Sequence, residues 1–161
     1  MRILVSLLLL SLPALAMAQD FSLDNYLFRW EVKRVGNTEF RVMKNEDSAY
    51  INVYRTSGLV SVAVRMPGPD AVLVGQALAR TQEVFEAQEG SSDNVSEAVV
   101  AGNFTVTFRT SLFSGFTVVI QENDRNSTNA VTLSREEAIG MQPELLRANE
   151  YLAFMESKLA F

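Results

Sequence analysis

Several short segments in the first part of the chain alternate between apolar and polar residues, which is the period of a β-strand with one buried face. Turn-forming residues separate these segments, with Gly36-Asn37 after the first and Ser57-Gly58 after the third. The pattern predicts an antiparallel meander. Its strands are expected at residues 24–35, through Phe40 and Val42, at 49–56 and at 59–66.

Helical spacing replaces this alternation after residue 66. Pro69 suits the first turn of a helix, and the carboxylate of Asp70 favours the positive end of the helix dipole. The following residues form one stripe at helical spacing, which predicts a single helix that ends near Ala87. The stripe consists of Ala71, Val74, Leu78, Thr81 and Phe85.

The second part of the chain has a similar order. Alternation predicts strands at 104–109, 116–120 and 130–133. Ser134, with Glu137 three residues later, has the capping-box pattern that begins a helix. Pro143 is expected to begin a second helical segment, because proline inside a helix removes a backbone hydrogen bond. That segment carries a stripe of Leu145, Ala148, Leu152, Met155 and Leu159.

Strands that precede helices indicate an α+β fold, in which antiparallel meander sheets pack on amphipathic helices. The length allows one domain, 19–161, which could divide into halves 19–90 and 91–161. Residues 54–57 (Tyr-Arg-Thr-Ser) and 108–111 (Phe-Arg-Thr-Ser) have similar sequences and are 54 positions apart. This similarity reflects either a duplicated ββββα unit or chance. Four strands followed by a helix, twice over, is similar to the layout of the Whirly single-strand-binding fold. The chain has no motif of that family, so the resemblance is one of layout.

Residues 1–18 have the pattern of a cleavable secretory signal peptide. A positive Arg2 precedes an apolar run, Pro13 interrupts the run, and Ala16-Met17-Ala18 supplies the small residues that signal peptidase requires. The run is too short to span a bilayer, which needs about 20 apolar residues. The expectation is an exported, soluble protein that has no integral membrane segment after cleavage.

The chain contains no cysteine, and this bears on the cellular compartment in which the protein is expected. No lipid anchor or disulfide can form, and a domain of this size can bury enough apolar surface without disulfides. This favours a bacterial periplasm, with secretion as the alternative. Asn-x-Ser/Thr sequons begin at Asn94, Asn103 and Asn126, but a loop composition rich in Asn and Ser also explains them.

Composition excludes several classes of chemistry. Without histidine or cysteine the chain cannot use Ser-His-Asp or Cys-His catalysis, thiol redox chemistry or the usual zinc sites. The formal charge of −5 repels phosphates, so nucleic-acid binding is not expected. No Gly-rich phosphate loop is present, and no cofactor is predicted.

Carboxylates remain as candidate catalytic or metal-binding groups. Glu46-Asp47 and Glu136-Glu137 could supply a glycosidase pair or a site for a hard cation. Adjacent acids on a helix point in different directions, however, and acids in a first turn favour the helix dipole. The loop that contains Glu122, Asp124 and Asn126 lacks the EF-hand spacing. We therefore predict no catalytic residue and no metal site.

Arg55 and Arg109 are candidate binding residues. If the halves are repeats 54 positions apart, the two guanidiniums are equivalent and could hold a carboxylate or phosphate. Alternatively, each arginine lies on a solvated sheet face and pairs with a neighbour such as Glu31.

Tyr50 and Tyr54 are candidates for a different reason. They lie on the face of their strand opposite Ile51 and Val53, so that the strand is apolar on both sides. Either a second layer, such as the C-terminal helix, covers the tyrosine face, or this face is a patch for a partner protein or an acyl chain.

These features favour a non-enzymatic binding or accessory protein of the cell envelope that engages a partner protein. One alternative is a carboxylate-based hydrolase of an envelope polymer, which needs two acids in one cleft. The other is a carrier of an apolar small ligand, which needs a cavity between sheet and helices. The oligomeric state does not follow from the sequence.

Overall fold

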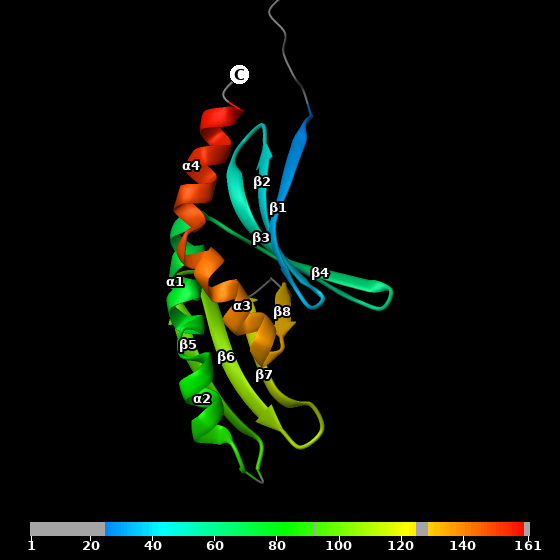
Figure 1. The fold of residues 1–161 in the computed structure, drawn as a ribbon, viewed down its shortest axis with the longest axis vertical. Coiled ribbons are helices and arrows are strands. Elements are labelled where there is room, and N and C mark those ends of the chain that lie inside the picture. The colour runs from blue at the N-terminus through cyan, green and yellow to red at the C-terminus, as the bar shows by residue number, and fades with distance from the viewer. Residues whose placement is uncertain (1–24, 92, 125–128, 160–161) are drawn as a thin grey trace, which may run out of the picture.

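The computed structural model describes residues 25–159, except residue 92 and residues 125–128 (Figure 1). The predicted signal peptide lies outside the described residues. The first half of the described chain contains β1 (Leu27–Val35), β2 (Thr38–Asn45), β3 (Ala49–Ser57), β4 (Val60–Met66), α1 (Gly68–Leu78) and α2 (Thr81–Gln88). The second half contains β5 (Val95–Ala101), β6 (Phe104–Ser111), β7 (Gly115–Glu122), β8 (Ala130–Leu133), α3 (Arg135–Leu146) and α4 (Ala148–Lys158). None of these helices is long and apolar enough to cross a membrane.

The strands form two four-stranded antiparallel sheets, which confirms the predicted α+β fold with meander sheets. The strand order is β1-β2-β3-β4 in one sheet and β5-β6-β7-β8 in the other. β5 is absent from the strands predicted from the sequence. Its alternation is weak, because residues 98–101 are all apolar and only its first half carries polar side chains.

The helix expected from Pro69 to Ala87 is in fact two helices. α1 ends at Leu78 and α2 begins at Thr81. The hydroxyl of Thr81 donates a hydrogen bond of 2.6 Å to the carbonyl of Leu78. This bond satisfies a carbonyl at the end of α1, which has lost its helical donor, while the chain turns into α2.

The helix break expected at Pro143 is at the wrong position. Pro143 lies inside α3, and the chain bends at Arg147, where φ is −98° and ψ is 10°. The N–H of Arg147 donates to the carbonyl of Glu144 at 3.1 Å, a short-range bond that closes the last turn of α3. Both Pro143 and Ile139 are exposed, so water can hydrate the carbonyl of Ile139 that loses its donor at the proline.

The helices connect the two sheets. α1 and α2 follow the first sheet in sequence but lie against β5 and β6 of the second, whereas α4 lies against β2 and β3 of the first. α1 and α3 pack on each other, and all the helices lie on one side of the molecule in Figure 1. Each sheet therefore buries its inner face with helical residues from the other half.

The two halves repeat one register, and its spacing is not the predicted 54. Val53 pairs with Val64 in the first sheet, and the residues 67 positions later, Ile120 and Val131, pair in the second. The buried residues of α2 and α4 have the same spacing, as Thr81 and Ala148, Val84 and Tyr151, and Gln88 and Met155.

This register also decides how the two candidate arginines are related. Arg55 lies opposite Thr38 on the third strand of its sheet, and the residue in that place in the second sheet is Glu122, opposite Phe104. Arg109 lies on β6, the second strand of its own sheet. Arg55 and Arg109 are therefore not equivalent.

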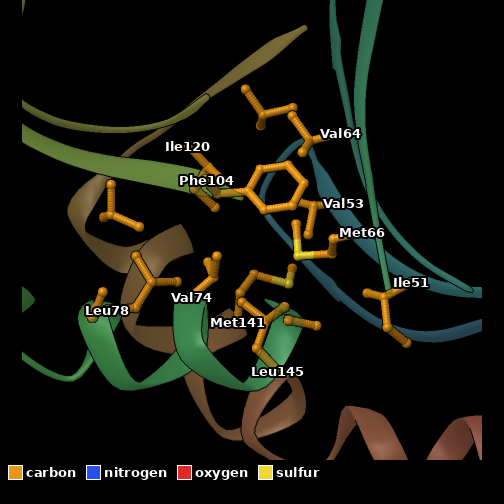
Figure 2. Close-up of a cluster of buried hydrophobic side chains, with 14 of the residues drawn as sticks. Ile51, Val53, Val64, Met66, Val74, Leu78, Phe104, Ile120, Met141 and Leu145 are labelled. Atoms are coloured by element: carbon orange, nitrogen blue, oxygen red, sulfur yellow. The ribbon is translucent and has the colours of Figure 1, made fainter. Parts of the chain in front are cut away.

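One hydrophobic core joins both sheets and the helices. Figure 2 shows Phe104 of the second sheet between Val53, Val64 and Met66 of the first, with Met141 of α3 nearby. These side chains are at most 2% exposed. Because this core contains residues from both halves, neither sheet has a complete core of its own.

Candidate functional site

Arg55 is engaged inside the protein. Its Nε donates to Oε2 of Glu137 at 3.3 Å, and the two side chains are 25% and 6% exposed. Glu137 also accepts from the backbone N–H of Asn37 at 3.0 Å and from that of Ser134 at 2.8 Å. The bond to Ser134 belongs to the capping box expected from the sequence. Arg55 therefore pairs with Glu137 rather than Glu31, and this contact fixes the start of α3 against the β1–β2 turn.

Asp70 holds the corresponding place in the other half. It is the third residue of α1, as Glu137 is of α3, and it is buried. Its Oδ2 accepts a hydrogen bond of 2.9 Å from the side-chain amide of Asn103 in the β5–β6 turn. Each helix start thus holds the first hairpin turn of the opposite half, with Glu122 in the place of Arg55.

A pocket of about 360 Å³ lies beside Asp70. Glu122 and Asp124 line it together with Arg65, so acids do gather in one place. Among the described residues, no group of three or more acids is arranged to hold a metal ion. In this half, Asp70 and Glu122 thus lie at a pocket, in the places that Glu137 and Arg55 occupy as an ion pair in the other half.

Tyr50 and Tyr54 lie together on the outer face of the first sheet. The guanidinium of Arg65 lies 3.6 Å from the ring centroid of Tyr50, and that of Arg41 lies 3.6 Å from the ring of Tyr54. α4 packs on the opposite face of β3, the one that carries Ile51. Of the two alternatives for this face, coverage by the C-terminal helix is wrong, because arginines stack on the tyrosine rings there instead.

Arg109 is exposed near the end of the second sheet. It lines a pocket of about 350 Å³ together with Ser96, Ser111 and Phe113, whose ring is fully exposed on the β6–β7 turn. Arg109 makes no ion pair with another described residue. It is therefore open to an anionic group, whereas Arg55 is not.

A largely apolar surface groove lies between β1 and α4, and we name it the β1–α4 groove. It has a volume of about 340 Å³. It lies at the unpaired edge of the first sheet, since β1 has no strand on its outer side in the described part of the chain. Its lining residues are Phe28, Arg29 and Trp30 of β1, and Phe154, Met155, Lys158 and Leu159 at the end of α4.

Aromatic contacts fix the shape of this groove. Trp30 packs against Phe154 and, edge to face, against Tyr151, with 5.6 Å between ring centroids in both pairs. Tyr151 in turn donates a hydrogen bond of 2.5 Å to Glu144, and burial, followed by this bond, raises the pKa of its phenol. Trp30 and Phe154 nevertheless remain 36% and 50% exposed. The rings are thus held in place yet accessible.

The charges at the groove are positive. Arg29 and Lys158 line it, and the ammonium of Lys158 lies 5.6 Å from the ring centroid of Phe154. No acid is among the residues of the groove in the described part of the chain. This contrasts with the net charge of −5 for the whole chain.

Sequence reasoning identified the candidate tyrosines and arginines but missed this groove. Phe28 and Trp30 lie on one face of the first predicted strand, 24–35, and Met155 and Leu159 are on the helical stripe. The available signal is Phe154, an aromatic residue next to that stripe rather than on it. Of the predicted site residues, only Tyr50 and Tyr54 lie together; Arg55 is on the inner side of the same sheet and Arg109 is on the other sheet.

Comparisons with known proteins give no family for this chain. No family model matches it, and no curated protein matches it. Among solved structures, it is similar to a chain from the structure of a guide-RNA-binding protein complex bound to a guide RNA. The TM-score is 0.29 and the identity 17%, over 76% of this chain and 90% of that chain.

Proposed function

We propose that this protein is a non-catalytic binding module that holds an extended, acidic segment of a partner protein in the β1–α4 groove. One observation carries the proposal: two exposed aromatic rings, Trp30 and Phe154, lie beside an unpaired strand edge with cations at the rim. With the leader predicted from the sequence, its place of action would be the cell envelope.

The strand edge supplies the backbone contacts. Pairing between β1 and β2 is regular from Leu27 to Glu31, and the register shifts only between Glu31 and Lys33. Within the described part of the chain no strand lies on the outer side of β1, so an added strand can pair along this edge. Alternate side chains of that strand would lie on the same face as Phe28 and Trp30, over the groove.

The aromatic rings supply the affinity. Trp, Tyr and Arg are the residue types that dominate binding energy in protein interfaces. Because Trp30 is held by Tyr151 and Phe154, little side-chain entropy is lost when a ligand covers it. An apolar side chain packed on the exposed faces of Trp30 and Phe154 would be removed from water on several sides.

The charges supply selectivity. Arg29 and Lys158 attract carboxylates, whereas the overall negative charge repels most acidic chains elsewhere on the surface. A partner segment with alternating apolar residues and flanking Asp or Glu therefore fits this groove better than a basic or uniformly apolar one.

A selection experiment tests the proposal. Residues 19–161 are exposed to a library of displayed peptides of about eight residues, a length that spans one strand. The expected consensus alternates apolar residues with Asp or Glu. Synthetic consensus peptide is then titrated while the emission of Trp30, the single tryptophan, is followed.

Matched variants decide the outcome. Phe154→Ser should weaken binding about 10-fold or more, which is typical of a central interface residue. Phe113→Ser removes another exposed phenylalanine, on the β6–β7 turn, and should leave affinity unchanged. A selection that yields no consensus, or peptides that bind Phe154→Ser as tightly as the parent, would refute the groove as the binding site.

A further inference from the structure

We infer that a second copy of this chain binds at β5, so that two molecules associate edge to edge through their second sheets. β5 is the outer strand of its sheet and has no strand on its other side in the described part of the chain. It pairs with β6 without a register shift from Val95 to Ala101. A regular, unpaired edge of this kind can pair with an identical strand.

β5 lacks the devices that keep strand edges apart. β1, in the corresponding place of the first sheet, carries Arg29, Lys33 and Arg34 and has an irregularity after Glu31. β5 contains no lysine, arginine or proline, and its single charged residue is Glu97. Natural edges avoid self-pairing through charges and bulges, so their absence from β5 marks it as a joining edge.

The outer face of β5 itself carries no charged side chain, although Arg109 of β6 lies beside it, opposite Ser96. On its outer face, Ser96, Ala98 and Val100 are exposed, and Val100 is 75% exposed. Glu97 points to the other face, where its carboxylate pairs with Arg80 at 2.7 Å. Two copies that meet at β5 therefore bring small neutral side chains together.

The residue order also fits antiparallel self-pairing. A two-fold axis at Ala98 places Ser96 opposite Val100 of the other copy and Glu97 opposite Val99. An axis at Val99 places Glu97 opposite Ala101. In neither register do the two Glu97 residues lie directly opposite each other, so the strongest like-charge repulsion across strands is absent.

This inference commits to a second copy rather than to a foreign peptide, because one interface satisfies the same unpaired edge on both molecules. The two second sheets would become one continuous sheet across the two-fold axis. The β1–α4 groove is at the other sheet and stays accessible in each copy.

Native mass spectrometry and light scattering at about 100 µM chain test the inference, because association depends on protomer concentration. The parent protein should form a dimer. Val100→Lys should weaken dimerisation about 10-fold or more, since a two-fold interface contains the change twice. Val60→Lys is the matched control: Val60 is 64% exposed at the edge of the first sheet, and its change should have no effect.

Cross-linking adds a positional test, which the natural absence of cysteine makes simple. Opposed Cα atoms in adjacent strands are about 4.5–5.5 Å apart, within disulfide range. A cysteine at the axis residue, Ala98→Cys or Val99→Cys according to the register, should give a disulfide dimer on mild oxidation, whereas Val60→Cys should not. A monomer at all concentrations, or equal cross-linking of the axis variant and Val60→Cys, would overturn the inference; a dimer that Val100→Lys leaves intact would place the contact elsewhere and overturn it too.

Discussion

β1 and β5 are outer strands in the same place of two sheets with the same strand order, yet their chemistry differs. β1 carries several cations and borders an aromatic groove, whereas β5 has one charged residue and pairs with β6 without a register shift. Buried positions of the two halves stay alike, as Val53 and Ile120 or Met66 and Leu133 illustrate. The repeated core therefore sets the scaffold, and the edges differ in what they can bind.

A second contrast concerns the helix starts. Glu137 is held by Arg55 and by backbone N–H groups, while Asp70 is held by the amide of Asn103 and has Glu122 nearby in place of the arginine. The same geometry thus gives a neutralised contact in one half and an acidic pocket in the other.

The largest expected effect comes from removing the better-connected acid. Glu137→Ala leaves Arg55 and two backbone N–H groups without their acceptor, and should lower the free energy of unfolding by about 3–5 kcal/mol. Asp70→Ala should cost about 1–3 kcal/mol, because one neutral donor, Asn103, loses its acceptor. Urea denaturation of both variants measures the difference. Equal losses of unfolding free energy in the two variants would show that Arg55 adds no stability at the start of α3.

The next effect concerns the turn that Asp70 holds. Gly102 has a φ of +64°, and a Cβ there would overlap Oδ1 of Asp70. Gly102→Ala should cost about 1–3 kcal/mol through backbone strain and loss of the Asp70 contact. Gly58→Ala, at a similar φ of +59° but with open space around it, reports the strain alone. The melting temperature of Gly102→Ala should be lower than that of Gly58→Ala. The reverse order would contradict the close approach of Gly102 to Asp70.

The groove on β1 should dominate binding. Trp30→Ala should reduce the affinity of a selected acidic peptide by about 2 kcal/mol or more, as for other central aromatic residues. Calorimetric titration measures this loss, and circular dichroism checks that the variant is folded. Undiminished affinity in a folded Trp30→Ala variant would place the peptide elsewhere.

The smallest effect should come from the rim charges. Lys158→Glu should weaken the binding of an acidic peptide by about 1 kcal/mol at low salt. The effect should be smaller at high salt, because exposed charges are screened. The matched change Lys44→Glu, on β2 and outside the groove lining, should have less effect. Fluorescence titration at two ionic strengths distinguishes them, and a salt-independent loss would argue against charge attraction.

Local patterns predicted most of the fold and little of the binding surface. The alternation around Phe28 and the Ser134–Glu137 capping box are local signals, and both elements are present in the structure. The groove, in contrast, brings Trp30 next to Phe154 from the far end of the chain. The partner of Arg55 is similarly remote, because Glu137 reaches it only after α3 packs on the β1–β2 turn. Such contacts depend on how the halves pack, which no local period encodes.

Hydrogen exchange on residues 19–161 tests the proposed difference between the two edges most directly. Adding the selected acidic peptide at low protein concentration should slow exchange at the amides of residues 27–31 and leave β5 unchanged. Raising the protein concentration without peptide should slow exchange in β5 and leave β1 unchanged. If peptide protects β5, or neither addition protects an edge strand, the account of two edges with different occupants is wrong.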